Sequence, residues 1–167
     1  MARLDSTKAE VVVLTFKQGL LSAVAHDLKL QVGRFTLDAE GDGLVGEFDT
    51  ASVRVIDAMR AGHEHPGALS ASMKADIEKN IVHDVLESRK HPTARFETTK
   101  VTAESVEGRL TLHGVTRDVR GTRKDVGGQR IAEFHFDQRD FGITPYSAML
   151  GTLKIKPEVV VRVSVPA

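Results

Sequence analysis

The chain of 167 residues has no cysteine, no tryptophan and a single tyrosine. Without cysteine, disulfides, thiolate metal sites and cysteine nucleophiles are excluded together. Lys plus Arg and Asp plus Glu both number 23, so no excess positive charge exists to attract a phosphate backbone or an anionic lipid surface. We therefore expect no nucleic-acid partner.

The sequence also lacks a long apolar run. No segment approaches the ~20 apolar residues of a membrane-spanning helix, so we expect no stable membrane insertion. The opening MARLDSTKAE carries Asp5, Lys8 and Glu10 where a secretory signal has an apolar core. The expected location is cytoplasmic, or periplasmic if a leader has been removed. The length favours a single domain over residues 1–167, large enough to bury about 70% of its unfolded surface.

Apolar and polar residues alternate along much of the chain, with the two-residue period of a β-strand. KAEVVVLTFK, residues 8–17, is β-branched and predicts the first strand. GDG at 41–43 indicates a turn, and LVGEFDTASVRV at 44–55 resumes as a strand, which predicts a hairpin.

The strand before that turn has a change of parity. In DLKLQVGRFTLDAEG, residues 27–41, the alternation shifts between Val32 and Phe35. A β-bulge at Gly33–Arg34 restores the inward face and bends the ribbon. Two separate short strands are the alternative.

One long helix interrupts the strands. Met73, Ile77, Ile81 and Val85 recur every four residues, which predicts an amphipathic helix over about 71–86. Ser70 or Ser72 can cap its start, and Pro92 prevents much continuation.

From Thr93 to the end the alternation returns. His113–Gly114 ends one strand where the chain reverses, because glycine accepts positive φ, and Val115 begins the return. In total about eight strands with short connections predict a mainly β fold, an antiparallel eight-stranded lipocalin-like barrel with one amphipathic helix and short helical turns. An eight-stranded barrel has room for side chains or for one small ligand.

Four segments resemble the YceI-like family of lipocalin-like barrels, which are associated with polyisoprenoids and other long amphiphiles. They are HDLKLQVGRFTLDAEG, ADIEKNIVHDVLESRKHPTARFET, GRLTLHGVTRDV and QRDFGITPYSAMLG. The resemblance implies non-catalytic carriage of an isoprenoid, isoprenoid quinone or fatty-acyl chain, and a possible homodimer. The strand EVVVRVSV at 158–165 would be prone to pair with another chain if its edge were open, which also favours association.

The helix stripe and several strand positions can face one interior, with Arg117 near a mouth to meet a phosphate or quinone oxygen. From the residues alone an ordinary packed core, as in a stress-related protein without a lipid, is the alternative, and the resemblance favours a ligand. The predicted ligand-binding residues are Leu28, Leu30, Phe35, Met73, Ile77, Ile81, Val85, Leu110, Leu112, Arg117, Phe134, Phe136, Met149 and Leu150.

A metal-binding barrel is the other alternative, because His63 and His65 in HEH lie two residues apart. The flanking Gly62 and Pro66–Gly67 are typical of an exposed loop. We therefore expect no functional metal and no cofactor.

Catalysis is not expected either. Ser22 and Ser147 lie outside any Gly-x-Ser-x-Gly motif. His26 and Asp27 are neighbours that point to opposite faces of a strand, so a local capping role is favoured over a catalytic pair.

Three more arginines, Arg34, Arg109 and Arg123, are expected to face water.

Overall fold

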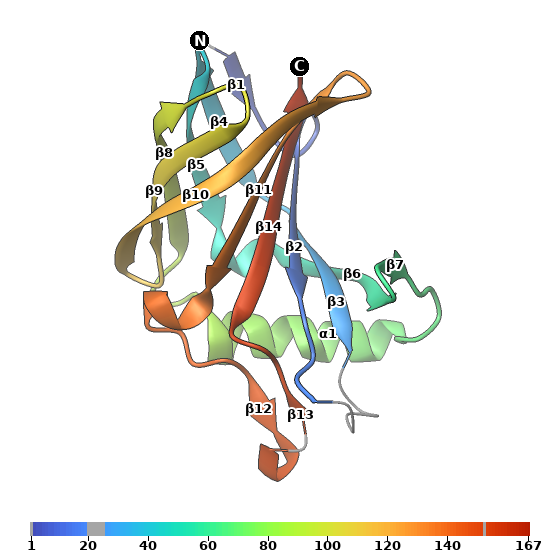
Figure 1. Cartoon of the computed structure of the whole chain (residues 1–167). Coiled ribbons are helices and arrows are strands. Elements are labelled where there is room, and N and C mark those ends of the chain that lie inside the picture. The colour runs from blue at the N-terminus through green and yellow to red at the C-terminus, as the bar shows by residue number, and fades with distance from the viewer. Residues whose placement is uncertain (1, 20–25, 152) are drawn as a thin grey trace.

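The computed structural model describes residues 2–19, 26–151 and 153–167, and it shows a mainly β fold with one long helix (Figure 1). The strands are β1 (Ala2–Leu4), β2 (Glu10–Thr15), β3 (Asp27–Val32), β4 (Phe35–Glu40), β5 (Gly43–Asp49), β6 (Val53–Arg60), β7 (His63–Glu64), β8 (Thr93–Val101), β9 (Ser105–Leu112), β10 (Val115–Val126), β11 (Gln129–Asp137), β12 (Ser147–Ala148), β13 (Leu153–Lys154) and β14 (Glu158–Pro166). The helical segments are η1 (Thr50–Ser52), α1 (Ala71–Asn80), η2 (Ile81–Val85), η3 (Gln138–Phe141) and η4 (Met149–Gly151).

Twelve strands form one antiparallel sheet in the order β1-β4-β5-β8-β9-β10-β11-β14-β2-β3-β6-β7, which curls into a half-barrel. β12 and β13 form a separate two-stranded ribbon. The predicted count of eight is therefore too low. β1 and β7 are too short to show a period in the sequence. In addition, the segments at 27–41 and 44–55, each predicted as one strand, are each divided into two strands.

The segment with the parity change is divided at Gly33–Arg34. β3 pairs with β2 and β6, whereas β4 pairs with β1 and β5, so the chain passes between the two ends of the sheet order within two residues. The predicted bulge at this point is wrong, and the alternative of two strands is confirmed.

The returning strand divides at the same corner, where η1 separates β5 from β6. Gly33 N donates to Ser52 O at 2.9 Å, and Asp49 N donates to Arg34 O at 3.0 Å. A Cβ at Gly33 would lie 3.0 Å from Ser52 O, so the close backbone approach favours glycine. β3 and β4 together with the returning strands β5 and β6 therefore form a hairpin that is folded at this corner. This folded hairpin joins the two ends of the curled sheet.

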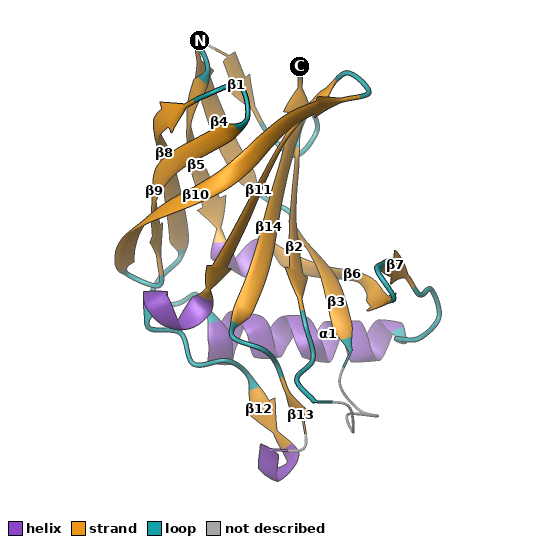
Figure 2. Ribbon diagram, viewed as in Figure 1, coloured by secondary structure: helices purple, strands orange, loops and turns teal. Residues whose placement is uncertain are grey.

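The predicted helix over 71–86 is confirmed as α1 followed by the π-helical turn η2. Ser70 Oγ accepts from Met73 N at 3.1 Å and caps the N-terminus, as predicted. The helix lies across one end of the half-barrel (Figure 2). Glu78 Oε2 accepts from Val55 N at 3.0 Å and ties the helix to β6. None of the described helices is long and apolar enough to span a membrane.

The hairpin at His113–Gly114 is confirmed, with Leu112 opposite Val115 and positive φ at both turn residues. His113 packs the turn onto two other segments. One ring nitrogen lies 3.2 Å from Phe141 O and the other 3.1 Å from Glu87 Oε1.

The strand at 158–165 is not at an edge. β14 pairs with β11 on one side and with β2 on the other, while β1 and β7 end the sheet. This removes the edge argument for association. The homodimer itself stays a prediction.

Candidate functional site: an elongated apolar cavity

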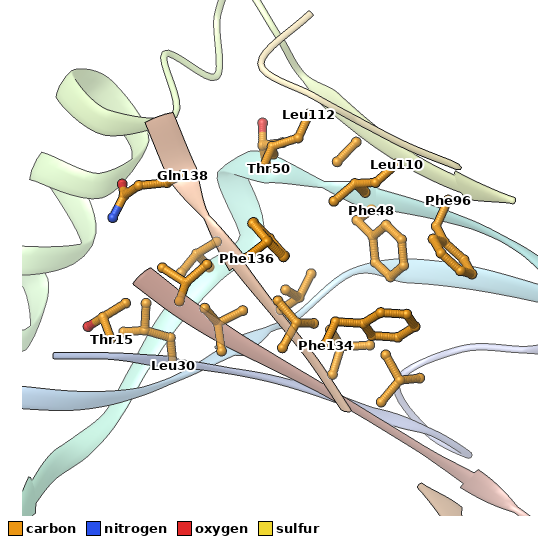
Figure 3. A pocket seen from close by; sticks show the side chains of 18 of the residues that line it. Thr15, Leu30, Phe48, Thr50, Phe96, Leu110, Leu112, Phe134, Phe136 and Gln138 are labelled. Carbon is orange, nitrogen blue, oxygen red and sulfur yellow. The ribbon is translucent and has the colours of Figure 1, made fainter. Parts of the chain in front are cut away.

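The interior of the half-barrel is not filled by side chains. A cavity of about 390 Å³ lies inside the curled sheet. Its wall runs from Ile77 and Ile81 of the helix to Asp42, in the turn between β4 and β5, at the opposite end. We call these the helix end and the hairpin end. Figure 3 shows side chains from several strands converging on this space.

The wall is apolar because strand alternation turns every second residue inward. Along β14 the lining residues are Val159, Val161, Val163 and Val165. Ile77, Ile81 and Leu86 also pack against a buried cluster that contains Leu28 and Leu30, so the helix covers the apolar end of the sheet.

Aromatic rings shape the middle of the cavity, and they lie over glycines. Phe96 and Phe134 meet edge to face, with ring centroids 5.4 Å apart. A methyl group on Gly108 would overlap the Phe96 ring, and one on Gly121 would lie 2.8 Å from Phe134 Cδ1. Because glycine has no Cβ, both rings can lie against the sheet and leave the space beside them open.

The hairpin end carries charge. Arg123 lines the cavity with its side chain only 12% exposed, and its Nη1 donates to Thr102 O at 3.0 Å. Its Nη2 lies 3.6 Å from Asp42 Oδ1. Arg130 also lines the cavity, and its Nε donates to Asp125 Oδ1 at 3.1 Å. This hydrogen bond raises the pKa of Arg130 and lowers the pKa of Asp125.

The helix end carries neutral polar groups. Thr15 lines the cavity, and its buried Oγ1 has no hydrogen-bond partner among the described residues. Gln138 is 6% exposed, and its Nε2 donates to Lys156 O at 3.1 Å. Asn80 Nδ2 donates to Tyr146 Oη at 3.1 Å, and both residues line the cavity.

Most of the predicted ligand-binding residues meet at this cavity. The lining includes Leu28, Leu30, Ile77, Ile81, Val85, Leu110, Leu112, Phe134 and Phe136. Their parity within strands or on the helix placed them on one interior face. Their contact with a ligand stays a prediction.

Four of the predicted residues do not line the cavity. Met73 is 44% exposed, because the helix packs against the core only from Ile77 onward. Phe35 is buried beside the corner of the folded hairpin, where it packs with Phe48. Leu150 is fully exposed in η4, where it takes positive φ.

Arg117 is the fourth, an exposed residue of β10 whose Nη1 lies 3.3 Å from Thr116 O. The side chain of Met149 lies outside the part of the chain that the structure describes.

Sequence reasoning missed the polar ends. Arg123 was expected to face water, as Arg34 and Arg109 do with side chains 75% and 61% exposed. Its parity carried a signal, because Arg123 lies four residues after the lining residue Val119 on the same strand. Thr15 and Gln138 carry the same signal, because Thr15 lies two residues after the lining residue Val13 and Gln138 lies two residues after the lining residue Phe136.

The histidines considered for chemistry lie in separate places. His26 lines the cavity, while Asp27 Oδ1 accepts at 2.8 Å from the backbone N of Lys17, which lies ten residues earlier. His63 is exposed in β7, next to Glu64, which pairs with a lysine. Within residues 2–19, 26–151 and 153–167, no group of three or more His, Asp or Glu side chains is placed to hold a metal ion.

Ser22 lies outside the described residues, and Ser147 is exposed in β12.

The folded hairpin, the covering helix and the internal cavity define an antiparallel β half-barrel with an apolar interior. Residues 3–167 match the YceI-like domain, and the chain belongs to this family. No relative among the curated proteins matches this chain.

Solved structures of similar fold include two that cover almost the whole chain. BcnA from Burkholderia cenocepacia has 15% identity and a TM-score of 0.63, with 95% of this chain and 96% of BcnA covered. A polyisoprenoid binding domain from Saccharophagus degradans, implicated in plant cell wall breakdown, has 11% identity and a TM-score of 0.60. The match covers 100% of this chain and 99% of that domain. At these identities the likeness concerns the fold alone.

Proposed function

We propose that the protein binds one long, mostly apolar amphiphile of the isoprenoid, isoprenoid-quinone or fatty-acyl type inside the half-barrel, without covalent chemistry. The observation that carries the proposal is the cavity of about 390 Å³ with an apolar wall. Its volume lies within the range of about 300–1,000 Å³ that is usual for small-molecule pockets. The polyisoprenoid binding of the Saccharophagus degradans domain supports the same ligand class.

The energetics favour a carrier. Each buried methylene is worth ~0.8 kcal/mol relative to water, so a chain of about twenty carbons gains more than ~10 kcal/mol before the costs of binding. A bilayer offers the same chain a similar gain. Transfer between membrane and protein is then nearly balanced, and occupancy follows supply.

Native mass spectrometry of the full chain tests this proposal. The protein is measured as purified, after extraction with organic solvent, and after incubation of the extracted protein with phytane, a branched C20 hydrocarbon. We expect one phytane bound per extracted chain. An extracted protein that remains folded and binds neither phytane nor a C16–C20 fatty acid would contradict the proposal.

We further propose a homodimer, on the family resemblance, and a cytoplasmic location, or a periplasmic one behind a leader. A single monomer mass by light scattering across micromolar concentrations would refute the dimer. Fractionation of the source cells tests the location.

A further inference from the structure

One polar group on the cavity wall, at the helix end, differs from the others described above in having no hydrogen-bond partner within the described part of the chain. At the hairpin end Arg130 has the Asp125 carboxylate, and Arg123 has Thr102 O and, at 3.6 Å, Asp42. At the helix end the buried hydroxyl of Thr15 has no partner among the described residues. Buried polar groups are usually hydrogen-bonded, so an unpaired hydroxyl on a cavity wall points to a missing partner inside the cavity.

Gln138 lies close to Thr15 and has hydrogen-bonding capacity to spare. Lys156 connects the two, because its O accepts from Gln138 Nε2 and its N donates to Phe16 O at 2.8 Å, one residue after Thr15. An amide nitrogen carries two hydrogens, so one Gln138 N–H is left after the bond to Lys156. Figure 3 shows Thr15 and Gln138 together on the side of the helix, away from Phe96.

The charges near this end disfavour an anion. Asp49 also lines the cavity, but its oxygens are engaged by Ala51 N at 2.9 Å and by Arg34 Nε at 3.0 Å. Among the lining residues that the structure describes, the two arginines belong to the hairpin end, and the remaining basic side chain is the imidazole of His26. A carboxylate or phosphate beside Thr15 would therefore be desolvated with no arginine or lysine of the described cavity lining at that end to pair with it.

We propose that the helix end of the cavity holds the head group of the amphiphile, and that this head group is neutral and offers an oxygen acceptor, as an alcohol or a quinone carbonyl does. Thr15 Oγ1 and the free N–H of Gln138 are its donors. The hydrocarbon chain then extends past Phe96 and Phe134 toward the hairpin end. This inference rests on the proposed function and adds to it the class and the orientation of the head group.

Three ligands with the same branched chain test the proposal: phytane with no head group, phytanol with an alcohol, and phytanic acid with a carboxylate. Their affinities for the extracted full chain are measured by displacement of a fluorescent acyl probe. Thr15→Val keeps the shape of the side chain and removes the hydroxyl. Thr15→Ser keeps the hydroxyl. Thr122→Val, at an exposed position of β10, is the matched control.

We expect Thr15→Val to weaken phytanol binding about tenfold, the factor that corresponds to ~1.4 kcal/mol for one hydrogen bond. Phytane affinity should not change. Thr15→Ser and Thr122→Val should bind phytanol as the unmodified protein does. The melting temperature of the empty protein should rise with Thr15→Val, because an unpaired buried hydroxyl is removed.

Two results would overturn the proposal. One is an equal effect, or no effect, of Thr15→Val on phytanol and phytane. The other is tighter binding of phytanic acid than of phytanol, which contradicts a neutral head group; its loss in Arg123→Gln would place the anionic head group at the hairpin end. Failure of all three ligands to bind the unmodified protein would instead refute the proposed function itself.

Discussion

Gly108→Ala should destabilise the protein and shrink the cavity. A methyl group at Gly108 would overlap the ring of Phe96 and lie 2.8 Å from Glu97 O. The backbone oxygen belongs to the neighbouring strand and cannot retreat easily, so the ring must move into the cavity. Overpacking of this kind costs roughly 1–3 kcal/mol. For a chain of this length, about 2–4 °C per kcal/mol predicts a fall in melting temperature of about 2–12 °C.

Calorimetry and probe displacement measure the two effects on the same preparation. Gly43→Ala is the matched control, because a methyl group there would meet Thr98 Cβ at 3.7 Å, an ordinary contact distance. The control should melt close to the unmodified protein and retain the probe. A Gly108→Ala protein with unchanged melting temperature and unchanged probe affinity would refute the argument that the glycine makes room for the ring.

Three further outcomes are expected. Leu112→Arg should abolish probe retention, because an unpaired guanidinium in an apolar wall costs several kcal/mol; a folded variant that retains the probe would contradict this. Ser70→Ala should lose ~1 kcal/mol of unfolding free energy with the helix cap, whereas Ser72→Ala should not, as urea titration will show. Hydrogen bonds from Lys90 and His113 lower the pKa of Glu87 from its ordinary value of 4.5. The carboxylate therefore stabilises the fold above about that pH, and this contribution is lost as the pH falls through the lowered pKa, so Glu87→Gln should weaken the acid dependence of urea stability; an unchanged pH slope would count against the contact.

The helix and most strands were readable from the sequence because each has a period. The four-residue stripe and the cap at Ser70 predicted the helix, and alternation predicted the hairpin at His113–Gly114. The corner at Gly33–Arg34 was misread because a bulge and a break change parity in the same way. Only the pairing of β3 and β4 with different partners distinguishes them.

Within the site, the residues that could be predicted are likewise those that follow a period in the sequence. Nine lining residues share an inward parity that the sequence displays. Met73 shares the helix stripe but lies before the segment that meets the core, and a helical period does not indicate where packing begins. The unpaired hydroxyl of Thr15 depends on which neighbours fail to reach it, a property of the folded wall alone.

Anomalous diffraction from crystals of the full chain, loaded with a C20 alcohol that is brominated at its far end, tests the central claim most directly. The account predicts a bromine peak within the cavity, beyond Phe96 and Phe134 toward the hairpin end, with the alcohol oxygen near Thr15. A bromine peak outside the half-barrel, or side chains collapsed to fill the cavity with no chain inside, would contradict it.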